Sequence, residues 1–197
     1  MSDHLADFQK LIDVLESLLS PGGCEWDRKQ THQSLVPYLL EETHEVIEAI
    51  EKGDINSLKE ELGDLVLHVL FQAKLAETEG HFNISDSLKD ISEKLIRRHP
   101  QVFNDDKSSS DNNLSWEQAK KKEKKRDSVL DGVPLSLPTL TRARRIQEKA
   151  SSVGFDWKEI KPIWSKVHEE ISELSEAITL EQKDKIQDEM GDVLFSV

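Results

Sequence analysis

The sequence is short of cysteine and of long apolar runs, and each shortage excludes a class of protein. A single cysteine, Cys24, cannot form an intrachain disulfide, so a disulfide-stapled secreted scaffold is excluded. No stretch approaches the roughly 18 consecutive apolar residues of a membrane span. The start, MSDHLADFQK, also lacks the basic and apolar regions of a signal peptide. We therefore expect a cytoplasmic protein with no membrane partner.

Positive charge is also scarce. The 197 residues include 26 Lys and Arg against 39 Asp and Glu, which gives a formal net charge of −13 at pH 7. Proteins that bind nucleic-acid polymers normally present a basic face, so we do not expect such a partner. A nucleotide ligand remains compatible with this acidity, because a bound divalent cation inverts the local sign of charge.

Apolar residues recur at the spacing of amphipathic helices, which predicts an all-α fold. We expect the first helices over residues 4–19, 32–52, 54–79 and 85–99. Thr31 is expected to cap the second of these helices, and Pro100 is expected to end the fourth.

The second and third expected helices carry acidic pairs. Glu42 and Glu45 are three residues apart, as are Glu61 and Asp64, so each pair shares one helical face. A Gly-Asp step between the helices predicts an antiparallel hairpin in which the two pairs face each other. Carboxylates withdrawn from water either protonate or bind a cation. Hard oxygen ligands without a thiolate favour Mg²⁺ or Mn²⁺.

The acidic pattern recurs later in the chain at a constant offset. Shifting EETHEVIEAI by 128 residues superposes it on EEISELSEAI, and the same shift superposes EELGDLVLHV on DEMGDVLFSV. The acidic residues of the second copy are Glu170, Glu173, Glu189 and Asp192. A solvated helix face, the alternative interpretation, has no reason to hold this register. The recurrence therefore favours a metal site in each copy.

The repeat predicts two related helical units. We expect a first unit over 1–103, a linker with a short charged helix over 104–130, and a second unit over 131–197. By the same offset, the basic helix end at 94–99 would fall at 222–227. We therefore expect the second unit to be incomplete, either completed by a neighbouring chain or dependent on the first copy.

Basic side chains gather at the end of the fourth expected helix. Lys94, Arg97 and Arg98 lie in its last turns, just before Pro100. Two interpretations stay open at this point. The cations complement the helix dipole, or they form a clamp for phosphate, which the arginine fork suits well.

These motifs, in this order, resemble the MazG family of nucleoside triphosphate pyrophosphohydrolases. The motifs are CEWD, EExxE, ExxD, RRHPQVF and the repeated GFDW…EEISE…EMGD. The resemblance runs through essentially the whole chain, in the two-copy arrangement of the longer bacterial members. It implies tandem helical-bundle units of the all-α NTP pyrophosphatase type. It also implies a homodimer that converts NTP and water to NMP and pyrophosphate with Mg²⁺, Mn²⁺ being possible.

The resemblance also assigns roles to particular residues. The implied metal ligands are Glu42, Glu45, Glu61 and Asp64 in the first copy and Glu170, Glu173, Glu189 and Asp192 in the second. The candidate substrate-binding residues are Lys166, Glu169, Glu170, Asp192, Lys94, Arg97 and Arg98, the last three on the phosphate-clamp interpretation rather than from the resemblance. Lys166 matches a nucleotide-contacting lysine of the family, whereas the first copy has Tyr38 at that offset. Glu41 or Glu169, beside the ligands, is the hypothesised catalytic base.

Two other functions stay open. A non-catalytic helical dimerisation or interaction module would use its acids only for solubility, and pyrophosphate release would distinguish it from the enzyme. A di-iron carboxylate protein pairs facing carboxylates with Glu-x-x-His, which Glu41 and His44 match once. However, the repeat partner of His44 is Ser172, so the histidine does not recur with the acids.

Overall fold

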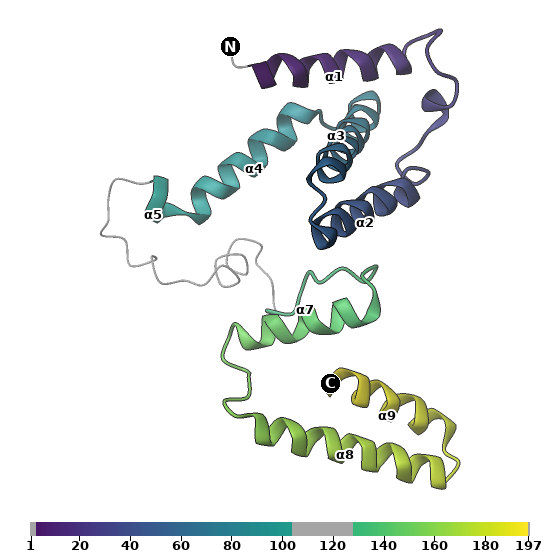
Figure 1. The fold of residues 1–197 in the computed structure, drawn as a ribbon, viewed down its shortest axis with the longest axis vertical. Helices are drawn as coiled ribbons and strands as arrows, with labels where there is room; N and C mark the ends of the chain where they lie inside the picture. Colours follow the sequence, from purple (N-terminus) through teal and green to yellow (C-terminus); the bar gives the residue numbers. More distant parts are fainter. Residues whose placement is uncertain (1–2, 104–127, 197) are drawn as a thin grey trace. The chain divides into compact units, whose positions relative to one another are not determined.

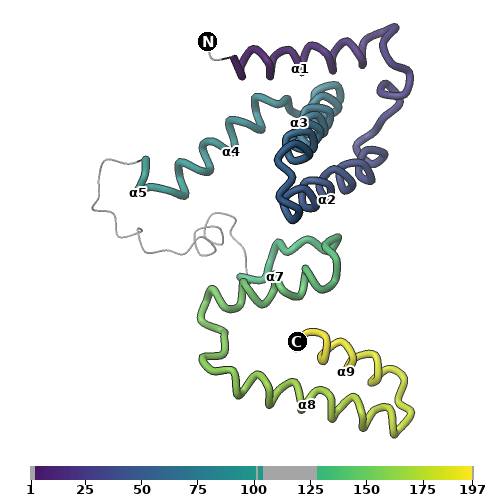
Figure 2. The backbone as a smooth tube through the Cα atoms, in the orientation of Figure 1, coloured from purple at the N-terminus to yellow at the C-terminus, as the bar shows by residue number. Residues whose placement is uncertain are grey.

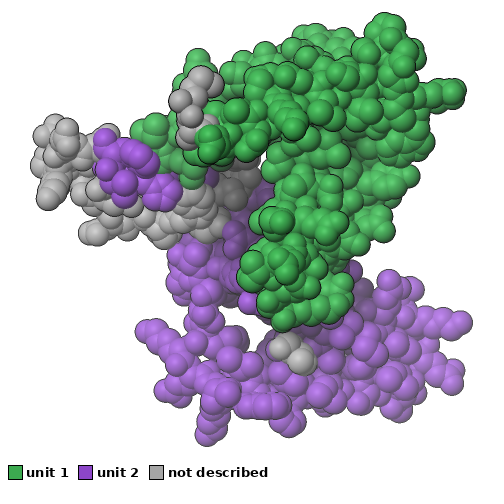
Figure 3. Space-filling view, turned by 45° about the horizontal axis from the view of Figure 1, so that its top comes forward, with its two compact units in different colours: residues 1–97 green, residues 98–197 purple. Residues whose placement is uncertain are grey.

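The computed structural model describes residues 3–103 and 128–196, and these residues form helices and loops with no strand among them (Figure 1). The all-α prediction is thereby confirmed. The chain divides into two compact units, residues 1–97 and 98–197 (Figure 3), which we describe separately. The short charged helix expected within the linker lies outside the described residues. The unit boundaries expected from the sequence, at 103 and 131, stay a prediction.

The first part of the chain is built around a helical hairpin. Its elements are α1 (Asp3–Leu19), the 3₁₀ turn η1 (Asp27–Lys29), α2 (Val36–Lys52), α3 (Ile55–Thr78), α4 (Ile84–Arg98) and α5 (Pro100–Phe103). Helices α2 and α3 run antiparallel and pack on each other, and α1 packs on α3 (Figure 2). This hairpin holds the first pair of acidic motifs.

A small apolar core fixes α3 against α1. Leu15 of α1, Leu35 just before α2, and Leu70 and Phe71 of α3 are buried together. Beside this core the ammonium of Lys74 lies 2.7 Å from a carboxylate oxygen of Glu16, which links α3 to α1. The buried residues lie toward the C-terminal half of α3, so its N-terminal half remains available for the acidic motif.

Helix α2 begins later than the sequence predicted. The expected cap, Thr31, instead accepts a hydrogen bond at 3.1 Å from the backbone N–H of Ser34, within a turn. Leu35 occupies the N-cap position without a side-chain cap, and Pro37 lies in the first turn of the helix. A proline fits the first turn of a helix, where its missing N–H would have no helical partner. The helix therefore begins at Val36, with Pro37 in its first turn, rather than next to the threonine.

The turn between α2 and α3 has the predicted chemistry. Gly53 adopts a left-handed conformation with φ of +68°, and Asp54 is the N-cap of α3. The Asp54 carboxylate accepts hydrogen bonds from the backbone N–H groups of Asn56 at 3.0 Å and Ser57 at 3.1 Å. Both features fix the backbone of the turn that joins α2 to α3.

The second unit repeats this hairpin. Over residues 128–196 its helices are α7 (Thr139–Ser151), α8 (Ile160–Thr179) and α9 (Lys183–Ser196), and α8 packs on α9. The turn places Glu181, 128 residues after Gly53, in the same left-handed region with φ of +53°. The N–H of Gln182 donates to Ala177 O at 3.1 Å, as that of Asp54 donates to Ala49 O at 2.9 Å. The sequence repeat is therefore also a structural repeat.

A buried lysine holds the segment that precedes α7. Lys149 is only 1% exposed, and its ammonium donates hydrogen bonds to the carbonyls of Val129 at 2.9 Å and Asp131 at 3.3 Å. These bonds compensate the cost of burying the charge. They also fasten residues 128–131 onto α7.

Within the described part of the chain, no helix combines the length and apolarity that crossing a membrane requires.

Candidate functional site

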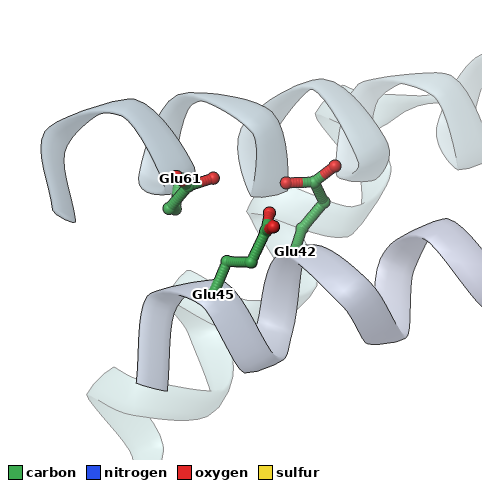
Figure 4. A group of neighbouring side chains, drawn as sticks. All are labelled: Glu42, Glu45 and Glu61. Carbon is green, nitrogen blue, oxygen red and sulfur yellow. The ribbon is translucent and has the colours of Figure 1, made fainter. Parts of the chain in front are cut away.

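Three carboxylates converge between α2 and α3. Glu42 and Glu45 project from one face of α2, and Glu61 projects from α3 toward them (Figure 4). One carboxylate oxygen from each residue lies within 4.8 Å of the other two. The helical spacing of three residues and the antiparallel packing of the hairpin together produce this cluster.

Asp64 adds a fourth carboxylate to the first site, but it is not one of the three residues whose oxygens converge. It lies one turn after Glu61 on α3 and is half-buried. The pKa of Glu42 is raised from 4.5 to about 6, first by burial and then by the negative charges of Asp64, Glu45 and Glu61. Burial also raises the pKa of Glu61, and the charge of Glu45 adds to this effect. All four predicted acids therefore interact electrostatically.

This arrangement fits a divalent cation. Carboxylates that share a site repel each other, and an ion between them removes the repulsion. The donors are all hard carboxylate oxygens, which suit Mg²⁺ or Mn²⁺ better than metals that prefer sulfur. The residues that would hold the ion are the convergent Glu42, Glu45 and Glu61.

The second hairpin brings together the corresponding residues. Oxygens of Glu170, Glu173 and Glu189 lie within 4.8 Å of one another. Burial raises the pKa of Glu189, followed by the charges of Glu173, Asp192 and Glu170. Asp192, like Asp64, lies outside the group of three but acts on it through its charge. Glu170 is only 5% exposed, so it is the most deeply buried of these acids.

A lysine distinguishes the second site from the first. The ammonium of Lys166 lies 2.7 Å from a carboxylate oxygen of Glu170 and 2.9 Å from one of Glu169. These two hydrogen bonds, the one to Glu170 first, raise the pKa of the lysine. At the corresponding position the first copy has Tyr38, whose ring meets the edge of Trp26 with centroids 5.7 Å apart. The first site therefore has an aromatic pair where the second has a cation.

The remaining predicted residues lie around these clusters. Glu41 and Glu169 are exposed neighbours of the metal-ligand candidates, and their role as catalytic base stays a prediction. Lys94, Arg97 and Arg98 lie at the C-terminal end of α4, which points away from α2 and α3 in Figure 1. Their assignment to phosphate binding likewise stays a prediction.

Two side chains near the first site received no functional role from the sequence, although Trp26 was expected to pack under the helix that follows it. His68 lies one turn after Asp64, and burial lowers its pKa while the Asp64 charge opposes the shift. Its buried Nδ1 has no hydrogen-bond partner among the described residues. Trp26 is half exposed and reaches Tyr38 from the η1 turn. The spacing of Asp64 and His68 could have indicated that the charge of Asp64 acts on His68, but no local pattern relates Trp26 to Tyr38.

Comparison with known proteins shows the family of the chain. Residues 30–103 and 159–197 match the model of the MazG nucleotide pyrophosphohydrolase domain. The chain is 47% identical over 192 residues to the nucleoside triphosphate pyrophosphohydrolase/pyrophosphatase MazG of Thermotoga maritima, covering 96% of this chain and 73% of that protein. It is 43% identical over 196 residues to the nucleoside triphosphate pyrophosphohydrolase of Escherichia coli K12, covering 95% and 74% respectively. The chain therefore belongs to the MazG family of nucleotide pyrophosphohydrolases.

Proposed function

We propose that this protein hydrolyses nucleoside triphosphates to nucleoside monophosphates and pyrophosphate in a reaction that requires Mg²⁺ or Mn²⁺. The observation that carries the proposal is the convergence of Glu42, Glu45 and Glu61, repeated 128 residues later in the second hairpin. Membership of the MazG family and the names of the two bacterial relatives support the same reaction.

The chemistry suits a site built from carboxylates. Cleavage of a phosphoanhydride needs positioning and charge neutralisation more than covalent participation by the protein. A bound divalent ion supplies neutralisation of phosphate oxygens and lowers the pKa of a water molecule. The convergent glutamates of each hairpin would hold that ion.

Other residues of the chain bind the triphosphate and move the proton. In the second site Lys166 offers an ammonium to phosphate oxygens. Glu169 is exposed beside the buried Glu170, and its carboxylate pairs with the Lys166 ammonium at 2.9 Å. We assign it the role of accepting a proton from water once the ammonium turns to phosphate. Glu41 occupies the same position in the first site. The two sites use the same acids with different surroundings.

We also propose that the protein works as a homodimer. Large apolar side chains on the hairpin helices remain exposed, among them Ile50 on α2 at 60% and Val69 on α3 at 55%. Exposed apolar side chains on two helices that pack together can form part of an interaction surface. A second copy of the chain that packs on this hairpin would bury it and shield the adjacent carboxylates from water.

The reaction is tested by product analysis with a panel of nucleoside triphosphates. We expect Mg²⁺-dependent release of pyrophosphate and nucleoside monophosphate, abolished by EDTA. Glu42→Gln and Glu170→Gln, measured separately, assign the activity to one hairpin or both. Release of orthophosphate and nucleoside diphosphate would refute the proposed bond, and no turnover of any substrate would favour the non-catalytic interaction module.

A further inference from the structure

The two acidic clusters differ in one respect that their shared sequence pattern does not explain. Each presents three convergent glutamates, but only the second has a cation one turn before its first glutamate. Lys166 and Tyr38 occupy equivalent positions, four residues before Glu170 and Glu42 respectively. The chain therefore contains a natural comparison of one site with and without an internal cation.

The side chain of Lys166 is 45% exposed, but its ammonium is held by two acids. Its ammonium contacts Glu170 at 2.7 Å and Glu169 at 2.9 Å, and Glu170 is 5% exposed. An ion pair with one buried partner is screened less by water than an exposed pair. The carboxylate oxygen that receives this ammonium belongs to the same residue that would hold the divalent ion.

We infer that Lys166 is an internal counter-ion that competes with the divalent cation for Glu170, so that the second site binds free metal more weakly than the first. This inference rests on the proposed metal-dependent function. When a triphosphate enters, its oxygens offer the ammonium an alternative partner and release Glu170 for the metal. In the first site the equivalent residue is Tyr38, whose side chain packs against Trp26, so no ammonium competes from that position.

The consequence is a division between the two copies. The first site binds a divalent ion independently of substrate. The second binds the ion and the triphosphate cooperatively, since each removes a competitor of the other. Lys166 is thus a positioning residue for the metal as well as a contact for phosphate.

The test measures Mn²⁺ affinity in the full chain, without nucleotide, by the loss of the free-ion electron paramagnetic resonance signal. The double variant Glu42→Gln/Glu45→Gln isolates the second site, and Glu170→Gln/Glu173→Gln isolates the first. In the isolated second site, we expect Lys166→Met to lower the Mn²⁺ dissociation constant about tenfold, because one neighbouring positive charge is removed. Lys166→Arg keeps the charge and should change the constant by less than about threefold.

Two further variants complete the design. Lys161→Met removes an exposed lysine from the same helix and should leave the constant within about twofold. In the isolated first site, Tyr38→Lys should raise the Mn²⁺ dissociation constant about tenfold. This variant tests the inference if Lys166→Met does not fold. Circular dichroism confirms folding of each variant.

The outcomes separate the inference from the function on which it rests. Unchanged or weaker Mn²⁺ binding by folded Lys166→Met, with both wild-type sites binding the ion, overturns the competition alone. Failure of both wild-type sites to bind Mn²⁺ overturns the competition and the proposed metal dependence together. Tighter binding in Lys166→Met with weaker binding in Tyr38→Lys supports the inference.

Discussion

Replacing Glu42 with glutamine should stabilise the metal-free protein. The pKa of Glu42 rises from 4.5 to about 6 in the folded state, because burial and three neighbouring carboxylates disfavour its charge. That rise corresponds to about 2 kcal/mol, since one pKa unit is worth about 1.4 kcal/mol. Part of the side chain remains in water, so solvent screening reduces the expected effect to about 1–2 kcal/mol.

The sign of the pH dependence follows from the direction of the shift. A folded-state pKa above the ordinary value means that protonated Glu42 favours folding fully below pH 4.5. This contribution is lost as the pH rises through about 6. Glutamine resembles the protonated form at every pH. Glu42→Gln should therefore match the wild type near pH 4.5 and exceed it in unfolding free energy at pH 7.5.

Differential scanning calorimetry in EDTA measures this difference. At pH 7.5 the transition of the first unit should move up by roughly 5–10 °C in Glu42→Gln, since about 1 kcal/mol shifts the midpoint of a domain this size by about 4–8 °C. Glu41→Gln removes an adjacent exposed charge and serves as the control. An unchanged midpoint in Glu42→Gln at pH 7.5, or an equal gain at pH 4.5, would refute the electrostatic reasoning.

The remaining predictions concern metal linkage, the hairpin turns and the buried lysine. Mg²⁺ should raise the melting temperature of the wild type more than that of Glu42→Gln, and equal shifts in a fluorescence melt would contradict this. Glu181→Gly should stabilise the second unit by about 0.5–1 kcal/mol by relieving its left-handed backbone, while Gly53→Ala should cost about 1 kcal/mol in urea titration. Asp54→Ala should cost about 1 kcal/mol through loss of the α3 cap, and Asp54→Asn should cost less. Lys149→Met should cost about 1–3 kcal/mol by leaving two carbonyls without their donor, with exposed Lys161→Met as the neutral reference.

The acidic hairpins were predictable because helical spacing and a constant offset determine them. Glu42 and Glu45 must share a face of any helix that contains them, and the 128-residue register transfers the geometry to Glu170. The turn between α2 and α3 could also be predicted, since Gly53 and Asp54 are the residue types that such a turn requires. These features depend on neighbours in the sequence, which are visible without a structure.

The features that the sequence did not predict depend on tertiary packing or on the choice between two local structures, such as a turn and a helix start. Thr31 is a suitable cap residue, but it accepts a hydrogen bond within a turn, and α2 begins at Val36 with Pro37 in its first turn. Lys149 lies three residues after Ile146 on the apolar face of α7, yet its burial depends on carbonyls some 20 residues earlier in the chain. The contact between Lys166 and Glu170 follows from their spacing of four residues, but the depth of Glu170 depends on how α8 packs. In each case the missing information lies outside the local pattern.

Anomalous diffraction from crystals grown with Mn²⁺ tests the central claim most directly. The account predicts one or more anomalous peaks between Glu42, Glu45 and Glu61, and a peak among Glu170, Glu173 and Glu189 when a non-hydrolysable triphosphate is present. Peaks at neither hairpin, with these carboxylates directed into solvent, would contradict the account.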